Sequence, residues 1–82
     1  MEYFVYILYS EKVSKFYIGH TNDLDRRIYE HNLGHEKFTR TGIPWKLVYS
    51  KPFDSKLEAT REELKIKKRK SKKFIEDLIS QV

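Results

Sequence analysis

The chain has 82 residues and a formal net charge of +5, and it contains no cysteine. This length accommodates one domain, whose core buries roughly 60–65% of the surface that the unfolded chain exposes. The lack of cysteine excludes a disulfide framework and a thiolate metal site, so packing alone must stabilise the fold. No apolar run approaches the ~18 residues of a membrane span, and the N-terminus lacks the features of a signal peptide. We therefore expect a soluble, cytoplasmic protein that does not interact with membranes.

The first 19 residues contain two expected strands. Residues 2–9 are aromatic and β-branched with almost no polar break, which is typical of a central strand buried on both faces. A polar connection then leads to a short strand over residues 16–19. We expect Gly19 to end this strand, at a point where backbone freedom or the close approach of a ligand would be useful. Tyr6 shares one side of the first strand with Phe4 and Leu8, because side chains alternate along a strand. The pattern does not indicate which side faces a cleft.

A helix is expected over residues 23–33. Asn22-Asp23 offers an N-cap. Leu24, Ile28 and His31 then recur at helical spacing, and Gly34 ends the helix. Residues 35–44 are polar and contain glycine and proline, so they are expected to form a loop.

The second half of the chain contains one expected strand and two expected helices. The strand covers residues 45–49 and is closed by Pro52. Ser55 and Glu58 have the spacing of a capping box, so a helix begins there and runs to about residue 69. A last helix begins at Ser71 and closes over the core with one apolar face. That face consists of Phe74, Ile75, Leu78, Ile79 and Val82. The expected element order is β-β-α-β-α-α, an α+β arrangement.

Arg27 and His31 lie one turn apart on the expected helix 23–33. Arg27 borders the inward stripe of the helix, whereas Arg26 points away from it. The planar donors of a guanidinium match phosphate oxygens, although a structural ion pair explains such an arginine equally well. The imidazole of His31, with an ordinary pKa near ~6.5, is suited to carry a proton. A hydrogen-bonded histidine at a helix end is the alternative.

Glu63 lies between two apolar stripes of the expected helix 55–69. The stripes are Leu57, Thr60 and Leu64 on one side, and Ala59 and Ile66 on the other. An acid between apolar stripes is costly to bury without a counter-charge or a cation, so Glu63 is a candidate ligand for a hard divalent metal. The alternative is a structural ion pair with Arg27 or Lys67.

A basic run follows, between residues 65 and 73. It holds seven cations and no acid, whereas the rest of the chain has ten cations and twelve acids. This local patch suits a phosphate backbone, and the alternative is an ordinary solvated helix face. Its cations are Lys65, Lys67, Lys68, Arg69, Lys70, Lys72 and Lys73.

In order and spacing, these residues resemble the GIY-YIG nuclease superfamily, in particular its small stand-alone bacterial members. Phe4-Val5-Tyr6 stands where the first half of the motif lies, with Phe and Val in place of Gly and Ile, and Tyr17-Ile18-Gly19 matches the second half. The resemblance continues through Arg27, His31 and Glu63 and covers almost the whole chain. It implies a small three-stranded antiparallel sheet flanked by helices, with the active site across the sheet face and the first helix.

The resemblance also implies roles for five residues. Tyr6 resembles the general base or its relay, and Tyr17 the group that positions the attacking water. Arg27 would stabilise charge on the scissile phosphate, His31 would assist there, and Glu63 would hold one Mg²⁺ or Mn²⁺. Since a free tyrosine has a pKa of ~10, Tyr6 would need a nearby positive charge or a metal-bound water to act as a base.

The resulting expectation is a metal-dependent endonuclease that acts on nucleic acid, DNA first of all. Low sequence specificity is expected because the resemblance includes no separate DNA-recognition domain. We expect no small-molecule cofactor, and a monomer or a weak homodimer. The alternatives are a non-catalytic nucleic-acid-binding module and an accessory subunit of a DNA repair or processing complex.

Overall fold

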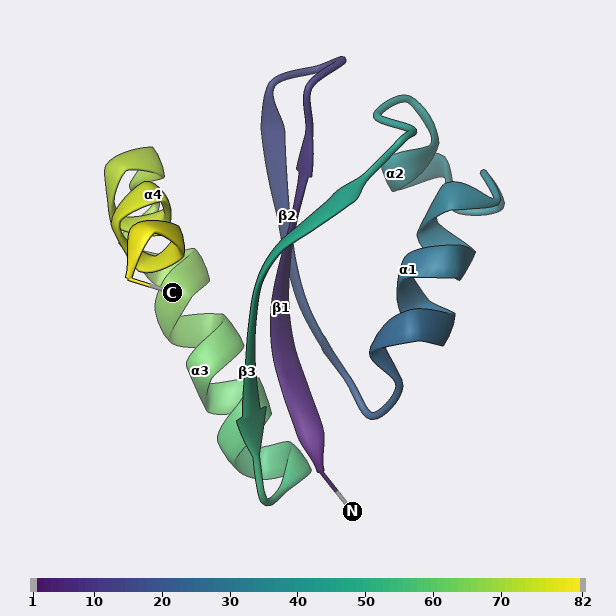
Figure 1. Ribbon diagram of the computed structural model, residues 1–82. Coiled ribbons are helices and arrows are strands. Elements are labelled where there is room, and N and C mark those ends of the chain that lie inside the picture. Colours follow the sequence, from purple (N-terminus) through teal and green to yellow (C-terminus); the bar gives the residue numbers. More distant parts are fainter. Residues whose placement is uncertain (1, 82) are drawn as a thin grey trace.

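The computed structural model describes residues 2–81. In it, a three-stranded antiparallel sheet carries helices on both faces (Figure 1). The elements are β1 (Tyr3–Ser10), β2 (Lys15–Thr21), α1 (Leu24–Asn32), α2 (Lys37–Arg40), β3 (Lys46–Phe53), α3 (Lys56–Arg69) and α4 (Lys72–Ser80). The helices α1 and α2 lie on one side of the sheet, and α3 and α4 lie on the other. This confirms the predicted α+β fold and its β-β-α-β-α-α order, to which α2 adds one short helix.

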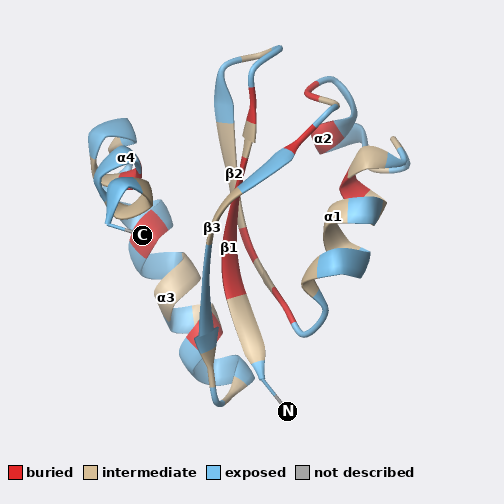
Figure 2. Cartoon of the chain, viewed as in Figure 1, coloured by how far each residue is buried: buried red, intermediate tan, exposed pale blue. Residues whose placement is uncertain are grey.

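The strand β1 is central in the sheet order β2-β1-β3 and is buried on both faces, as predicted (Figure 2). Val5 and Ile7 face α3 and α4, where they form a core cluster with Ala59, Ile66 and Ile75. Tyr6 and Leu8 face the other way and form a second cluster with Trp45, against which Leu24 and Ile28 of α1 pack. The sheet therefore separates two small cores, and Tyr6 belongs to the one beneath α1.

Both outer strands are longer than predicted. The strand β2 continues to Thr21, so Gly19 lies inside the strand and the prediction that it ends the strand is wrong. The strand β3 continues through Pro52 to Phe53, so Pro52 does not close it. Proline lacks an N–H group but is tolerated in an edge strand, where one side of the backbone makes no ladder hydrogen bonds.

The longer helices begin at side-chain caps. The side chains of Asp23, Ser55 and Ser71 accept hydrogen bonds from backbone N–H groups three residues later and start α1, α3 and α4. These caps confirm the predicted helix starts. The helix α3 ends at Arg69, and the C-cap residue Lys70, in a left-handed conformation (φ 48°), turns the chain towards α4.

The predicted loop over residues 35–44 contains the four-residue helix α2. Thr39 of this helix is buried, and Nε1 of Trp45 donates a hydrogen bond to its carbonyl oxygen at 2.6 Å. Asn32, at the end of α1, binds the backbone N–H and carbonyl of the same Trp45. These contacts attach α1 and α2 to the start of β3. Four residues are too few to show a periodic apolar pattern, which is why the sequence did not indicate α2.

The two apolar stripes of α3 differ in burial. Ala59 and Ile66 are buried in the core, whereas Leu57 and Leu64 are 59% and 49% exposed. The apolar face of α4 packs against the core through Phe74, Ile75, Leu78 and Ile79, as predicted. Val82, assigned to the same face, lies outside the described residues. None of the helices within residues 2–81 is long and apolar enough to cross a membrane.

Candidate active site

Three of the predicted site residues gather on the face of the sheet that α1 covers. Tyr6 comes from β1, Tyr17 from the neighbouring β2, and His31 from the last turn of α1. The ring centroids of Tyr17 and His31 are 4.6 Å apart, and those of Tyr6 and Tyr17 are 6.3 Å apart. The side of β1 that carries Tyr6 is thus the side of the candidate site, which the strand pattern alone left open.

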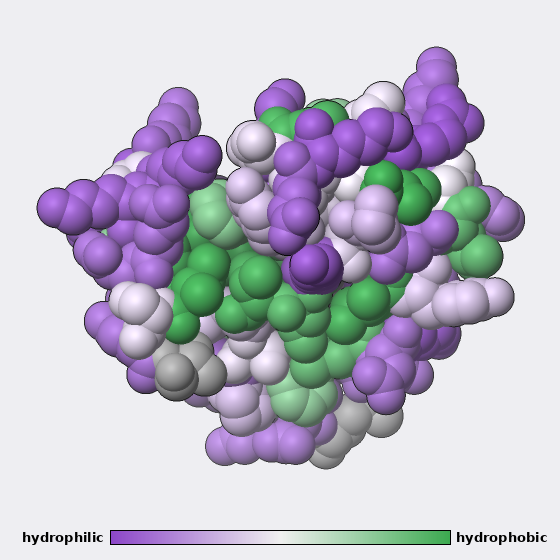
Figure 3. Space-filling view, turned by 45° about the horizontal axis from the view of Figure 1, so that its top comes forward, coloured by the Kyte–Doolittle hydropathy of each residue, from purple (hydrophilic) through white to green (hydrophobic). Residues whose placement is uncertain are grey.

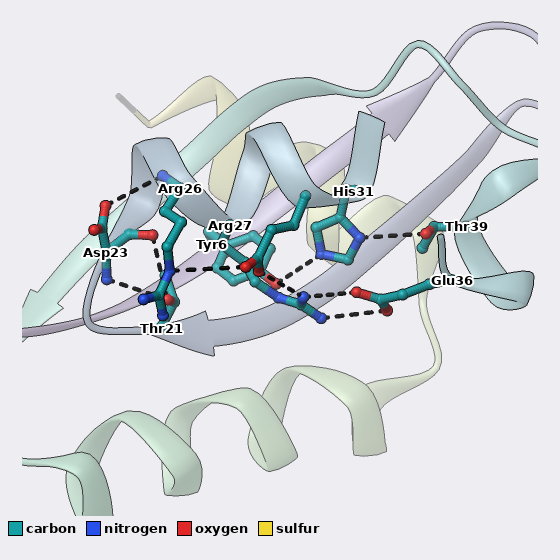
Figure 4. Close-up of polar contacts among 9 residues, drawn as sticks. Tyr6, Thr21, Asp23, Arg26, Arg27, His31, Glu36 and Thr39 are labelled. Atoms are coloured by element: carbon teal, nitrogen blue, oxygen red, sulfur yellow. Dashed lines mark hydrogen bonds and ion pairs between the residues drawn. The ribbon is translucent and has the colours of Figure 1, made fainter. Parts of the chain in front are cut away.

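Tyr6 and His31 form a buried hydrogen-bonded pair (Figure 4). The Oη atom of Tyr6 lies 3.0 Å from Nε2 of His31, and Nδ1 of His31 lies 3.4 Å from Oγ1 of Thr39. Tyr6 is 1% exposed and His31 is 0% exposed. Both ring nitrogens of His31 therefore have hydroxyl partners, which satisfies a polar ring that would otherwise be costly to bury.

Burial keeps this pair uncharged. It raises the pKa of Tyr6 to about 12, although the Arg27 guanidinium beside the phenol acts in the opposite direction. Burial also lowers the pKa of His31 below its ordinary value, and the positive charge of Arg27 adds to that effect. At neutral pH the pair consequently consists of a phenol and a neutral imidazole.

Gly19 makes room for the Tyr6 hydroxyl. The two residues are paired across β1 and β2, and a Cβ atom at position 19 would lie 2.7 Å from Oη of Tyr6. Even the smallest side chain would therefore collide with the phenol. The sequence predicted backbone freedom or close approach of a ligand at Gly19. Within the protein, the group that approaches its backbone closely is the ring of Tyr6.

Arg27 lies beside the pair and is held by two carboxylates. Its Nη1 donates to Oε1 of Glu36 at 2.6 Å and to Glu30 at 3.2 Å, and its Nη2 donates to Oε2 of Glu36 at 3.3 Å. This guanidinium holds the pKa of Glu36 below its ordinary value. The structural ion pair considered as an alternative for Arg27 is thus present. Glu36 lies in the predicted loop, where no periodic pattern could have indicated it.

Glu63 lies on the opposite side of the sheet, on α3. Its Oε1 lies 2.6 Å from Nδ1 of His20, and its Oε2 accepts a hydrogen bond from Nζ of Lys67 at 2.6 Å. Burial acts to raise the pKa of Glu63, but the hydrogen bonds from Lys67 and His20 outweigh it and lower this pKa. The ion pair with Lys67, considered as the alternative to a metal-ligand role, is present, and no contact joins Glu63 to Arg27 within the described chain.

His20 received no role from the sequence. It pairs with Val5 in the sheet, and alternation along β2 puts its side chain on the face opposite to Tyr17. Its position beside Glu63 could be foreseen only once the register of β2 and the rotation of α3 were known.

The Tyr6 cluster on one face of the sheet and the Glu63 cluster on the other both contact the edge strand β2. Gly19, against which Tyr6 lies, and His20, which binds Glu63, are neighbours in this edge strand. The negative charge of Glu63 is among the causes that raise the pKa of Tyr6, so the carboxylate lies within electrostatic range of the phenol.

Metal ligands are sparse at this edge. Among residues 2–81 there is no group of three or more His, Asp or Glu side chains that could hold a metal ion. Mg²⁺ commonly takes one or two protein carboxylates and completes its shell with water and substrate phosphates. Glu63 is the predicted metal ligand on this face, and both of its carboxylate oxygens are engaged by His20 and Lys67.

The basic run covers the corner between α3 and α4, where hydrophilic side chains gather at one flank of an apolar middle (Figure 3). All seven of its cationic residues are exposed. Two of them also make specific contacts, because Lys67 binds Glu63 and the Arg69 guanidinium lies 4.4 Å from the ring centroid of Phe74.

Comparison with known proteins places these residues in a wider group. The family model of the GIY-YIG catalytic domain matches residues 2–75. A UPF0213 protein of Halobacterium salinarum is 47% identical over 53 residues, which cover 63% of this chain and 69% of that protein. A UPF0213 protein of Staphylococcus haemolyticus is 42% identical over 67 residues, or 80% of each chain.

Coverage of the relatives is partial, and their names state no activity. The match to a UPF0213 protein of Streptococcus agalactiae, 46% identical over 54 residues, spans 61% of that protein. The solution NMR structure of a UPF0213 protein from Bacillus halodurans superposes with a TM-score of 0.61 at 40% identity, covering 99% of this chain and 85% of that one. This likeness agrees with the fold described above.

Proposed function

This chain belongs to the family of GIY-YIG catalytic domains, as its motifs predict, and we propose that it is a metal-dependent endonuclease that hydrolyses phosphodiester bonds in nucleic acid. The observation that supports this most is the buried contact between Tyr6 and His31 beside Arg27 and Tyr17. A phenol bonded to a neutral imidazole can take up and pass on a proton without a buried charge on the phenol.

In the proposed reaction, the oxygen of a water molecule attacks phosphorus, and the bond from phosphorus to the leaving oxygen breaks. The proton of the water passes to Oη of Tyr6 while the phenolic proton passes to Nε2 of His31, 3.0 Å away. His31 can accept it because its lowered pKa leaves it neutral at pH 7. The proton then returns to the leaving oxygen, which restores the pair. Tyr6 is thus the relay rather than an ionised base.

Tyr17, Arg27 and Glu63 complete the proposed site. Tyr17 is half-buried beside the almost fully buried Tyr6, and we assign to its hydroxyl the positioning of the water. Arg27, held in place by Glu36, neutralises charge on the scissile phosphate. Glu63 would hold Mg²⁺ or Mn²⁺, and the bound ion would supply further charge neutralisation at the phosphate. His20 and Lys67 hold the carboxylate from either side.

The exposed cations at the α3–α4 corner supply sequence-independent attraction to the nucleic-acid backbone. DNA is the substrate proposed first, with low sequence specificity, because the candidate site consists of groups for phosphate chemistry rather than for reading base edges.

The test is a cleavage panel of plasmid DNA and of single-stranded, duplex and branched oligonucleotides, each with Mg²⁺ and Mn²⁺. Arg27→Ala and Glu63→Gln should abolish metal-dependent nicking. Glu62→Gln is the matched control, because it removes the neighbouring carboxylate of α3 and should nick at the wild-type rate. Circular dichroism checks that each variant is folded. Nicking that survives both site substitutions would show that the assignment is wrong.

One observation favours a second candidate, a non-catalytic nucleic-acid-binding module. Both oxygens of Glu63 are engaged by His20 and Lys67, and Arg27 is engaged by Glu36 and Glu30. In a binding module these pairs would persist in the complex. Tight binding without cleavage across all the substrates and metals of the panel would favour this function.

A further inference from the structure

Phe38 is the most exposed large apolar side chain among the described residues, with 90% of its surface accessible to solvent. The aromatic residues Tyr17 and Trp45 lie beside it around a small cavity. We propose that these three side chains form a stacking site for one unpaired nucleobase, next to the candidate active site. This inference rests on the proposed function, because it assumes a nucleic-acid substrate.

Phe38 projects from an element that is firmly held. Its neighbour Thr39 is 1% exposed, accepts a hydrogen bond from Nε1 of Trp45 at 2.6 Å and lies 3.4 Å from Nδ1 of His31. Glu36, just before α2, is bonded to Arg27. The four residues of α2 are thus attached to β3 and α1, yet Phe38 contributes to neither core cluster. An aromatic ring presented to solvent by a fixed helix is suited to contact a ligand.

The walls of the cavity are largely aromatic. Its volume is about 170 Å³, and Phe16, Tyr17, Phe38 and Trp45 line it together with Val13, Lys15 and Thr41. Nucleobases stack on aromatic side chains with little dependence on sequence, because every base has a π-face. A paired base cannot enter such a cavity, so the site selects a nucleotide that is already unpaired or easily unstacked.

Charge around the cavity favours a nucleic acid over an apolar peptide. Lys15 is the charged residue among those that line the cavity in the described chain, and the exposed Lys37 directly precedes Phe38 on α2. No acidic residue lines the cavity in the described part of the chain. Cations around an aromatic surface complement phosphates on either side of a stacked base.

The position of Tyr17 connects the cavity to the chemistry. Its ring lies 4.6 Å from that of His31 and 6.4 Å from that of Trp45, measured between centroids. One ring therefore contacts the proposed proton relay and also forms a wall of the cavity. A base stacked there would place an adjoining phosphate near Tyr6 and Arg27.

The experiment measures binding without turnover. Two labelled duplexes are compared in buffer with EDTA, one fully paired and one with a single unpaired 2-aminopurine, whose fluorescence is quenched by stacking. Anisotropy gives the affinity for each duplex, and 2-aminopurine emission reports the environment of the base. The proteins are wild type, Phe38→Ala, Phe38→Trp and Tyr29→Ala. Tyr29 is an exposed aromatic on α1 that does not line the cavity, and therefore it provides the matched control.

We expect wild type to prefer the unpaired duplex by at least about fivefold and to quench its 2-aminopurine. Phe38→Ala should lose most of both effects, Phe38→Trp should retain them, and Tyr29→Ala should behave as wild type. An unchanged preference and quenching in Phe38→Ala would overturn the stacking site. The stacking site would also be overturned if sedimentation showed that wild type self-associates through Phe38 while Phe38→Ala left the DNA affinity unchanged.

The failure of this inference differs from the failure of the proposed function. If wild type nicks DNA in the cleavage panel but binds both duplexes equally and leaves 2-aminopurine unquenched, only the stacking site is wrong. If wild type binds neither duplex and also nicks no substrate of the cleavage panel, the stacking site and the proposed function both fail.

Discussion

The Oη atom of Tyr6 lies 3.0 Å from Nε2 of His31, a residue 25 positions further along the chain, and both side chains are buried. Each of these polar groups would be costly to bury alone, and each satisfies the other. The contact therefore fixes α1 on the sheet and defines one end of the candidate site. The same bond serves stability and the proposed proton transfer, so the two roles must be separated by experiment.

The depressed pKa of His31 should make stability depend on pH. Its pKa is lower in the folded protein than the value near 6.5 of the unfolded chain. As pH falls below about 6.5, the unfolded state therefore binds a proton that the folded state does not, and the free energy of unfolding decreases. Urea titrations between pH 8 and pH 5 measure this slope.

The control for that titration is a pair of variants. His31→Gln should abolish the slope between pH 6.5 and pH 5, whatever its overall stability, while His35→Gln, which replaces an exposed histidine, should keep it. The lowered pKa values of Glu36 and Glu63 act in a separate window, because their stabilisation is lost only as pH falls below about 4.5. A slope unchanged in His31→Gln would contradict the assignment to His31.

Replacing Gly19 with alanine should disturb the phenol of Tyr6. The new Cβ atom would lie 2.7 Å from Oη of Tyr6, and such overpacking in a small core typically costs about 1–3 kcal/mol. We expect Gly19→Ala to lower the unfolding free energy by roughly that amount and to reduce nicking. Chemical denaturation and initial nicking rates measure the two effects.

A double-mutant cycle identifies the cause of that loss. If the collision involves the hydroxyl, Gly19→Ala should cost less stability in a Tyr6→Phe background than in wild type. Equal costs in both backgrounds would show that the phenolic oxygen is not the group displaced.

Periodicity and capping residues were sufficient to predict most of the fold. The almost unbroken run of aromatic and β-branched residues at 2–9 identified the central strand, and Asn22-Asp23, Ser55 and Ser71 marked the starts of three helices. The strand ends were predicted less well, because a glycine or a proline interrupts a strand only if its neighbours demand it. Gly19 accommodates Tyr6, and Pro52 lies in an edge strand, so both strands continue.

The candidate site residues themselves were easier to predict than the side chains that bind them. Tyr6, Tyr17 and His31 do come together, as the family resemblance implied. Glu36 and His20, which hold Arg27 and Glu63, carry no local signal, because their contacts depend on a non-periodic segment and on strand register. The exposed stripe of α3 was likewise indistinguishable from the buried one, since a helical wheel gives spacing but not the direction of the core.

The basic corner between α3 and α4 should contribute mainly to salt-dependent binding. A triple variant replaces Lys68, Lys70 and Lys72 with glutamine. Removing one lysine from a DNA phosphate should reduce the slope of log affinity against log salt by about 0.9 for duplex DNA, so the slope of the triple variant should be shallower by up to roughly 2.7. Anisotropy titrations across a range of salt concentrations measure the slopes.

The control carries the same change in net charge at a different place. It replaces Lys46, Lys51 and Lys56, which are exposed on β3 and at the start of α3. This variant should keep a slope close to that of wild type. If both triple variants lower the slope equally, the attraction arises from the net charge and not from the α3–α4 corner.

Tyr6→Phe tests the central claim most directly, since it removes one oxygen atom and leaves the buried ring. The measurement is the single-turnover nicking rate with Mg²⁺ or Mn²⁺, at a protein concentration that saturates the DNA, beside Tyr9→Phe as the matched strand tyrosine. We expect Tyr6→Phe to lower the rate by at least about 100-fold with unchanged DNA affinity, and Tyr9→Phe to match wild type. Nicking by Tyr6→Phe at the wild-type rate would contradict a proton relay through Tyr6 and His31.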